Sequence, residues 1–390
     1  MGAVEGRTAD ATRTMADLVE RGAAEHGGKA AIRWRQAGEW RSLGFDELAA
    51  LTDELALGLL DLGVEPGDRV CVLANTRPEW TYASLAISRA GGVVVPVYPT
   101  NSPEECEWVA GNSEARAIFC ENEGQVAKIE RVRSKLPALE HVLSFEPVDG
   151  ALGLDELRQR GAGDDADELR RRAEAIGSDD AYTFVYTSGT TGPPKGCVIT
   201  HGNAAAVCSI IRDLDLISQE GDEAYLYLPL AHVFALVTEL GAIEVGAALS
   251  FFGGDTRRII DELKEANPTY IPSVPRIFEK LYTLATQQLA KASESEREQF
   301  QRAVKLGVEV RMRDARGEEV PAEMRAKLDR VDEAIFKHVR GLFGNRLRLA
   351  VSGAAPIAPE ILEFFYAAGV PVLEGWGMTE TCAVDRKSVV

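Results

Sequence analysis

A chain of 390 residues is longer than one small hydrophobic core supports, so its length allows two or three domains of ordinary size. Its composition, 45% hydrophobic and 27% charged, is that of a folded globular protein and excludes a largely disordered chain. Because 61 acidic residues outnumber 43 basic ones, the net charge is −18, which argues against a protein that binds nucleic acid.

The first third of the chain predicts alternating helices and strands. Apolar residues recur every three or four positions from Phe45 to Leu62, as in a helix with one apolar face. The turn at residues 65–68 then leads into a short β-branched run at residues 69–73, which is typical of a buried strand. Strands that alternate with helices indicate an α/β fold with layered, mostly parallel sheets and flanking helices. The alternation continues through helix 80–90, strand 93–97, helix 104–112 and strand 117–120.

Cysteine usage and hydropathy predict the compartment. The six cysteines form no C-x-x-C pair and no dense framework, so neither a zinc site nor disulfides are indicated, and we expect a reducing cytoplasm. No apolar run reaches the roughly 18 to 20 residues that span a bilayer, and the polar N-terminus lacks a signal-peptide core. Any membrane contact is therefore expected to be peripheral.

A charged, Gly- and Ala-rich stretch at residues 150–180 predicts an exposed helix and a connector. The strand expected at residues 181–186 then runs into a segment with four hydroxyls, three glycines and a lysine. Glycines let backbone N–H groups face one point, hydroxyls add short donors, and the lysine adds a point charge, which together suit a polyphosphate. The segment reads Thr187-Ser188-Gly189-Thr190-Thr191-Gly192-Pro193-Pro194-Lys195-Gly196.

The alternatives for this loop are a mobile glycine-rich hairpin and the P-loop. A mobile glycine-rich hairpin would need neither the lysine nor the cluster of hydroxyls around the glycines. The P-loop of nucleoside triphosphatases has a lysine followed by Ser or Thr at the start of a helix. Here Lys195 precedes a glycine, and residues 198–200 continue as a strand. The sequence therefore points away from chemistry at the γ-phosphate.

The string at residues 186–196, YTSGTTGPPKG, resembles the signature loop of the adenylate-forming superfamily, which includes acyl-CoA synthetases, peptide-synthetase adenylation domains and luciferases. The resemblance implies the large N-terminal domain of the adenylate-forming fold. It also implies an enzyme that activates a carboxylate with ATP, releases pyrophosphate and passes the acyl group from acyl-AMP to a thiol. In that family the loop grips the departing phosphates, a role that falls here on residues 187–192 and Lys195.

Two downstream segments extend the resemblance. LPLAHVFA at residues 228–235 resembles the second core motif, in which a histidine lies beside the carboxylate and the α-phosphate, so His232 is a candidate catalytic residue. A histidine satisfied within the core is the structural alternative. AVSGAAP at residues 350–356 has the form of a strand that ends in a tight turn of small residues, and the alternative is an ordinary strand-to-helix turn. The resemblance places Ser352, Gly353 and Ala354 beside adenine.

EGWGMTET at residues 374–381 resembles the fifth core motif of the family. The resemblance implies that Trp376, in place of the commoner tyrosine, stacks on adenine, that Thr379 meets the α-phosphate, and that Glu380 holds Mg²⁺. Thr187 is the second expected Mg²⁺ ligand. A surface turn with a buried tryptophan is the structural alternative. The candidate catalytic set is Lys195, His232, Thr379 and Glu380, and the nucleotide-binding set of this motif is Glu374, Gly375, Trp376, Gly377, Met378 and Thr379.

The substrate is inferred from further resemblance. Residues 291–348 hold fourteen basic and eleven acidic residues and predict a helical insertion broken near Arg316-Gly317. The insertion, together with PLAHVFALVTEL and PTYIPSVPRIFEKLY, resembles long-chain fatty acyl-CoA ligases, which implies a fatty acid, ATP and coenzyme A as substrates and Mg²⁺ as cofactor. Its positive charge fits either a solvated insertion or a surface that meets anionic lipid or the phosphates of coenzyme A.

The end of the chain departs from the family pattern. Relatives continue past the fifth motif with a mobile C-terminal domain whose lysine completes adenylation, and this sequence does not contain it. We expect residues 1–384 to form the AMP-binding N-terminal domain, and residues 385–390 to be a non-native tail, because DRKSVV can be encoded by a string that resembles a sequencing-library adapter. Two other functions remain open: adenylation of another carboxylic acid, and nucleotide binding without catalysis.

Overall fold

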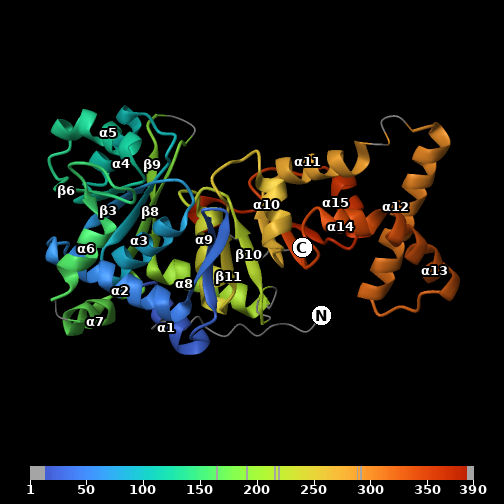
Figure 1. Ribbon diagram of the computed structural model, residues 1–390, viewed down its shortest axis with the longest axis horizontal. Coiled ribbons are helices and arrows are strands. Elements are labelled where there is room, and N and C mark those ends of the chain that lie inside the picture. Colours follow the sequence, from blue (N-terminus) through green and yellow to red (C-terminus); the bar gives the residue numbers. More distant parts are fainter. Residues whose placement is uncertain are drawn as a thin grey trace. The chain divides into compact units, whose positions relative to one another are not determined.

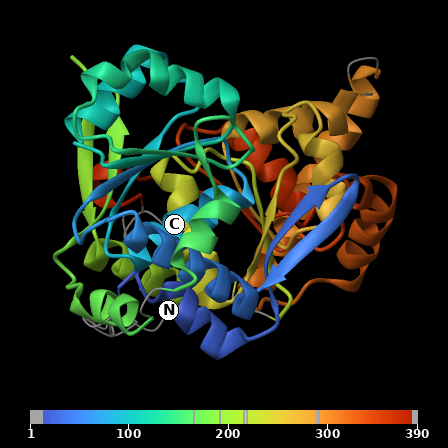
Figure 2. The same ribbon diagram turned by 60° about the vertical axis from the view of Figure 1, so that its left-hand side comes forward.

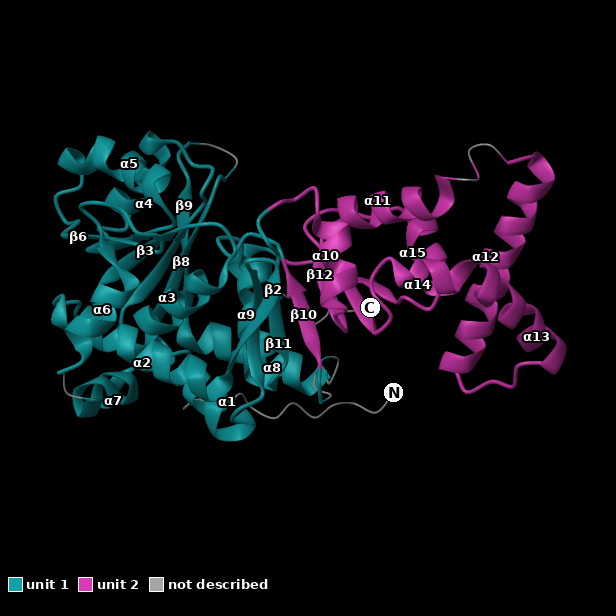
Figure 3. Ribbon diagram, in the orientation of Figure 1, with its two compact units in different colours: residues 1–221, 227–254, 378–384 teal, residues 222–226, 255–377, 385–390 magenta. Residues whose placement is uncertain are grey.

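The computed structural model describes residues 14–163, 166–189, 192–214, 217, 220–287, 289 and 292–383. The chain divides into two compact units, which Figure 3 shows in teal and magenta. Unit 1 comprises residues 1–221, 227–254 and 378–384, and unit 2 comprises residues 222–226, 255–377 and 385–390. The proposed tail at residues 385–390 lies outside the described residues.

Unit 1 contains a seven-stranded sheet in the order β7-β6-β5-β3-β4-β8-β9. The paired strands are parallel except for β8 and β9, which form an antiparallel hairpin. The strands are β3 (Arg69–Leu73), β4 (Val93–Val97), β5 (Ala117–Cys120), β6 (His141–Ser144), β7 (Leu152–Gly153), β8 (Ala181–Thr187) and β9 (Lys195–Thr200).

Helices cover both faces of this sheet, as Figure 1 shows. Helices α4 (Pro103–Asn112) and α5 (Glu123–Val132) pack on one face, where Cys71, Val95 and Ile118 meet Val109 and Ile129 in an apolar core. The central strands are buried on both sides, which explains their continuous β-branched runs. The other helical segments of unit 1 are α1 (Leu18–His26), α2 (Phe45–Asp61), α3 (Pro78–Arg89), η1 (Arg133–Lys135), α6 (Leu154–Gly161), α7 (Ala166–Ala175), α8 (His201–Leu214), α9 (Val233–Val245) and η4 (Thr379–Thr381).

Unit 1 also contains three strands in the order β11-β1-β2. Strands β1 (Ala30–Gln36) and β2 (Glu39–Gly44) form the antiparallel hairpin drawn in blue in Figure 2, and β11 (Ala248–Phe251) runs parallel to β1. The hairpin turns through Ala37 and Gly38, both with positive φ, as a tight two-residue turn requires.

Unit 2 holds four parallel strands in the order β14-β13-β12-β10 and a set of helices. Its core includes a cluster of edge-to-face rings from Phe278, Phe343 and Phe365. The strands are β10 (Glu223–Leu226), β12 (Tyr270–Ser273), β13 (Leu349–Ser352) and β14 (Val372–Glu374). The helices are α10 (Ile259–Ala266), α11 (Pro275–Thr286), α12 (Glu294–Ala315), α13 (Ala322–Val331), η3 (Asp332–Phe336), α14 (Lys337–Gly341) and α15 (Pro359–Ala367).

The helix–strand alternation expected from the sequence is confirmed, and the elements α2, β3, α3, β4, α4 and β5 begin and end within two residues of the predicted bounds. The break expected near Arg316-Gly317 is also confirmed, because α12 ends at Ala315. The connector expected at residues 150–180 contains two helices, α6 and α7, rather than one. Among the described residues, no helix is both long and apolar enough to cross a membrane.

Candidate functional site

The glycine-rich loop joins β8 to β9 at the carboxyl end of β8. Thr187, the last residue of β8, pairs with Lys195, the first residue of β9, so the two ends of the loop lie side by side. Gly189 and Gly192 have φ of 47° and 82°, in the left-handed region that favours glycine. The backbone conformation expected from the glycines is therefore present on both sides of the loop.

Side chains of this loop face solvent. Ser188 and Lys195 are exposed, and no described residue forms an ion pair with Lys195. Its ammonium is therefore available to an anion. Thr190 and Thr191 lie outside the described residues.

Two side chains of helix α4 form hydrogen bonds with the β8–β9 hairpin. The indole Nε1 of Trp108 donates a hydrogen bond to the carbonyl oxygen of Pro194 at 2.8 Å, and the hydroxyl of Tyr186 donates to Oδ1 of Asn112 at 2.7 Å. Neither contact is predicted by the sequence. The available signal was weak: Trp108 and Asn112 are four positions apart in the expected helix, so they share one face.

His232 is the N-cap of α9. Its Nδ1 accepts a hydrogen bond from the backbone N–H of Phe234 at 3.2 Å, so in the neutral imidazole the proton is on Nε2. Partial desolvation lowers the pKa of His232, which favours this neutral form. The side chain is nevertheless exposed, so Nε2 can donate to an oxygen of a ligand.

The last part of the fifth motif packs on the same hairpin. Segment η4, which carries Thr379 and Glu380, lies against β9. Burial raises the pKa of Cys197 on β9, and the nearby carboxylate of Glu380 raises it further. Met378 is exposed and Thr379 is buried. Unit 1 thus brings the strand that begins at Lys195 against the segment that carries Glu380, although the two are far apart in the sequence.

The residues present fit a magnesium ion that also binds phosphate. Glu380 is exposed, and no described residue pairs with its carboxylate. No group of three or more His, Cys, Asp or Glu side chains among the described residues could hold a metal alone. Mg²⁺ usually takes one or two protein ligands and fills the remaining positions with water and substrate phosphates, which suits Glu380 and the hydroxyl of Thr187.

Unit 2 holds the turn of small residues. Ser352 and Glu374 are partners at the carboxyl ends of β13 and β14, and the N–H of Gly375 donates to the Ser352 carbonyl oxygen at 2.8 Å. Ser352 and Gly353 are both buried, and the turn reaches the surface only from Ala354 onward. Ala354 has φ of 68°, a strained conformation for a residue with a Cβ.

The aromatic residue of the fifth motif follows this turn. Trp376 is 58% exposed and so offers an open ring face, rather than the buried tryptophan of the structural alternative. Oε1 of Glu374 accepts a hydrogen bond from the N–H of Ile357 at 3.3 Å, which fixes the two segments to each other. Gly377 is exposed beside Trp376. Unit 2 therefore brings together the two motifs that sequence analysis assigned to adenine.

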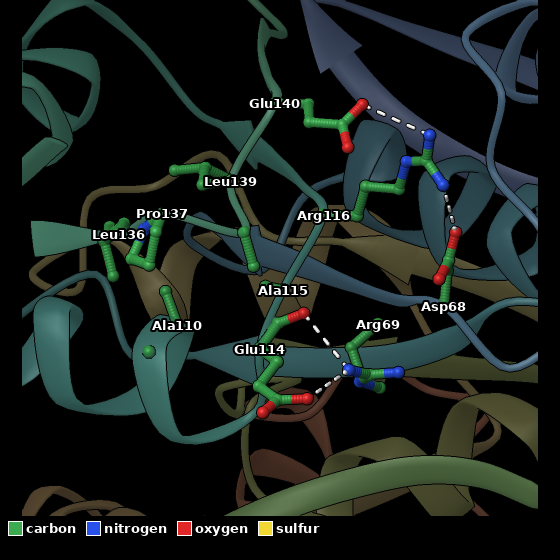
Figure 4. Close-up of a pocket in the computed structure, with 12 residues that line it drawn as sticks. Asp68, Arg69, Ala110, Glu114, Ala115, Arg116, Leu136, Pro137, Leu139 and Glu140 are labelled. Atoms are coloured by element: carbon green, nitrogen blue, oxygen red, sulfur yellow. Dashed lines mark hydrogen bonds and ion pairs between the residues drawn. The ribbon is translucent and has the colours of Figure 1, made fainter. Parts of the chain in front are cut away.

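A pocket of about 410 Å³ lies at the opposite, amino-terminal edge of the unit 1 sheet (Figure 4). Its charged groups pair with one another: Arg69 with Glu114 at 3.1 Å, and Arg116 with Asp68 at 3.1 Å and Glu140 at 3.2 Å. Ligands of parallel α/β sheets bind at the carboxyl ends of the strands. The pocket is therefore separate from the residues described above.

Comparison with known proteins fits these motifs. The sequence model of the family described as AMP-binding enzyme matches residues 19–388. The chain belongs to this family. It is 35% identical to the long-chain-fatty-acid–CoA ligase FadD15 of Mycobacterium bovis over 88% of this chain and 57% of that protein. It is 31% identical to the long-chain-fatty-acid–CoA ligase ACSBG2 of Gallus gallus over 99% of this chain and 52% of that protein. The chain thus spans little more than half the length of these curated relatives.

Solved structures show the same fold. The N-terminal domain of FACL13 from Mycobacterium tuberculosis is 21% identical, with a TM-score of 0.69 over 95% of this chain and 77% of that chain. The long-chain-fatty-acid-CoA ligase FadD1 from Archaeoglobus fulgidus is 20% identical, with a TM-score of 0.68 over 96% of this chain and 65% of that chain. The large N-terminal domain of acyl-CoA ligases expected from the sequence is therefore confirmed as the fold.

Proposed function

We propose that this chain is the nucleotide-binding part of an AMP-forming ligase that joins a long-chain fatty acid to coenzyme A. The observation that carries the proposal is the hairpin of unit 1, where exposed, unpaired Lys195 and the Glu380 segment lie on one strand pair. Relatives named as long-chain-fatty-acid–CoA ligases support the substrate class.

The reaction has two steps. An oxygen of the fatty-acid carboxylate attacks the α-phosphorus of ATP, the bond from that phosphorus to the bridging oxygen breaks, and pyrophosphate leaves with the electron pair. The sulfur of coenzyme A then attacks the acyl carbon of acyl-AMP, AMP leaves, and the thiol proton is released. In the first step an anion approaches an anion, so the site has to offset charge repulsion.

The described residues can supply this stabilisation without proton transfer. Loop amides and Lys195 neutralise the departing phosphates, and the segment that carries the buried Thr379 lies beside the α-phosphate in this proposal. Nε2–H of neutral His232 donates to an oxygen of the carboxylate or of the α-phosphate. Mg²⁺, held by Glu380 and Thr187, would add positive charge at the phosphate oxygens as a Lewis acid.

The unit 2 segments supply base recognition in this proposal. The turn from Ala354, which follows buried Gly353, presents a surface without bulky side chains, which suits the approach of a flat base. The exposed ring of Trp376 offers a π-face for stacking. Glu374, Gly375, Gly377 and Met378 complete the nucleotide-binding set.

Two further proposals concern the localisation of the protein and its contact with the membrane. We propose a cytoplasmic protein that contacts the membrane only peripherally, with the basic insertion at residues 291–348 as the contacting region. Anionic lipid attracts Lys and Arg even on an acidic protein, because the attraction acts within about 10 Å. Coenzyme A is a further candidate for the same charges.

The test is ATP-dependent formation of palmitoyl-CoA by the 390-residue chain, beside a version extended through the native downstream gene. We expect activity in the extended protein. Activity in neither, together with no acid-dependent pyrophosphate exchange across aryl, amino and fatty acids, would reject the ligase. Exchange with an aryl or amino acid alone would favour adenylation of another acid, and ATP binding without exchange would favour a non-catalytic protein.

A further inference from the structure

The hydroxyl of Thr76 both donates a hydrogen bond to and accepts one from the backbone of a single short segment, residues 228–230. Thr76 is buried just after β3, and its Oγ1–H donates to the carbonyl oxygen of Leu228 at 2.6 Å. The same oxygen accepts a hydrogen bond from the N–H of Leu230 at 3.2 Å. These two backbone groups flank Pro229, which has no N–H of its own. One side chain therefore satisfies the buried backbone on both sides of a proline.

The segment held by Thr76 leads directly to His232. The carbonyl oxygen of Pro229 accepts a hydrogen bond from the N–H of His232 at 2.9 Å. His232 then caps α9, and its carbonyl oxygen accepts from the N–H of Leu236 at 3.1 Å. The imidazole is thus fixed on one side by the helix and on the other by a turn that Thr76 holds.

Thr76 is itself held from the opposite side. The backbone N–H and the side-chain amide of Asn75 donate to Oε2 of Glu121 at 2.9 and 2.7 Å. Arg77 pairs with Oε1 of the same carboxylate at 3.4 Å. Glu121 is 9% exposed and directly follows β5. Both neighbours of Thr76 are therefore anchored on a buried carboxylate, so the position of Thr76 is held by contacts outside the His232 segment.

We propose that Thr76 is a positioning residue for His232: its hydroxyl holds the Leu228–Leu230 backbone and so fixes where Nε2 of the imidazole meets the reacting oxygens. The inference rests on the proposed role of His232 in the ligase reaction. Thr76 itself touches neither substrate in this scheme. It acts on the step in which charge on the carboxylate and the α-phosphate is redistributed, and a displacement of about 1 Å there costs about a hundredfold in rate.

The test compares Thr76→Val, Thr76→Ser and Thr52→Val in the form of the protein that is active in the palmitate assay. Thr76→Val keeps the shape but loses both hydrogen bonds, and Thr76→Ser keeps the hydroxyl. Thr52 is a matched control, because it is buried and no described residue partners its hydroxyl. For Thr76→Val we expect kcat to fall by at least about tenfold with the KM for ATP and palmitate within about twofold. Thr76→Ser should recover most of kcat, and Thr52→Val should retain it.

A second measurement follows the imidazole itself. The NMR resonances of the His232 ring should shift in Thr76→Val and return in Thr76→Ser. If Thr76→Val does not fold, Thr76→Ala, which also lacks the hydroxyl, takes its place under the same criteria. Unchanged kcat and unchanged ring resonances in the folded variant would overturn the inference, as would equal losses in the Val and Ser variants.

The variant His232→Gln separates this inference from the proposed function. If it loses activity while Thr76→Val keeps it, only the role of Thr76 is wrong. If it keeps full activity, the role of His232 in the reaction is wrong, whatever Thr76 does.

Discussion

The carboxyl of Glu239 lies in the apolar core of unit 1, on α9, where solvent does not reach it. Its Oε1 accepts a hydrogen bond from the hydroxyl of Thr81 on α3, and its Oε2 has no partner among the described residues. Burial raises the pKa of this carboxyl to about 8, against an ordinary value of 4.5, and the Thr81 hydrogen bond only partly offsets the rise. At neutral pH the folded protein therefore keeps Glu239 protonated.

This raised pKa predicts that stability declines as pH rises. Between the unfolded value of 4.5 and the folded value of about 8, the unfolded chain has released a proton that the folded chain retains, so each increase in pH favours unfolding. Glu239→Gln cannot lose a proton, so its stability should not decline in this way. We therefore expect the unfolding free energy of the variant, relative to that of the parent, to increase by at least about 1 kcal/mol between pH 4.5 and pH 8. Thr81→Val should extend the decline to higher pH. Urea denaturation across this range measures the effect, and parallel stability curves for parent and Glu239→Gln would contradict it.

A single carboxylate is also the proposed protein anchor for Mg²⁺. Glu380→Gln keeps the shape of the side chain but loses the charge, so we expect the Mg²⁺ concentration for half-maximal activity to rise at least about tenfold. Glu123→Gln, at an exposed position on α5, removes the same charge elsewhere in unit 1. Activity titrated with Mg²⁺ after EDTA treatment separates the two. An identical Mg²⁺ requirement in both variants would remove Glu380 from the metal site.

At the scale of elements, Trp108 is the contact by which α4 holds the phosphate loop. Trp108→Phe keeps an aromatic ring, though a smaller one, and removes the N–H that bonds to Pro194. Because one neutral hydrogen bond contributes about 1 kcal/mol, we expect the KM for ATP to rise about fivefold, with little change in kcat. Trp40→Phe is the control, since Trp40 is on β2 and stacks with Arg33 rather than with the loop. Equal changes in ATP KM for the two variants would show that the hydrogen bond to Pro194 does not set loop geometry.

Sequence patterns predicted the elements well because their signals are local. The apolar period of α2 and the β-branched runs of β3 and β4 each lie within one segment and match the structure closely. The motifs likewise marked Lys195, His232 and Glu380 as candidates.

The contacts that hold these residues could not be predicted, because they join distant segments. Thr76 and Leu230 are 154 positions apart, and Trp108 and Pro194 are 86 positions apart. Nothing in the residue types fixes such pairings. Glu239 was also missed, because it lies in the mostly apolar segment PLAHVFALVTEL, which contributed only to the family resemblance.

At the scale of the whole chain, the two compact units do not by themselves assign domains. The expected single AMP-binding domain at residues 1–384 stays a prediction, and so does the identity of residues 291–348 as an insertion. The family model supports continuity of the motifs across residues 19–388. The two units also divide the fifth motif, since residues 374–377 belong to unit 2 and residues 378–381 to unit 1.

Nucleotide binding should be visible as stability of the whole chain. A ligand that binds only the folded state stabilises it by about 2.7 kcal/mol at a hundred times its Kd, so Mg²⁺-ATP should raise the midpoint of thermal unfolding. Lys195→Met should reduce this shift, because it removes an exposed, unpaired charge from the loop. Lys29→Met is the matched control, since Lys29 is also exposed in unit 1 and its loss changes the net charge equally. Equal ATP-induced shifts in the two variants would mean that Lys195 does not contact the nucleotide. An ATP shift that depends on Lys195, without acid-dependent pyrophosphate exchange even in the extended protein, would leave binding intact and reject the ligase.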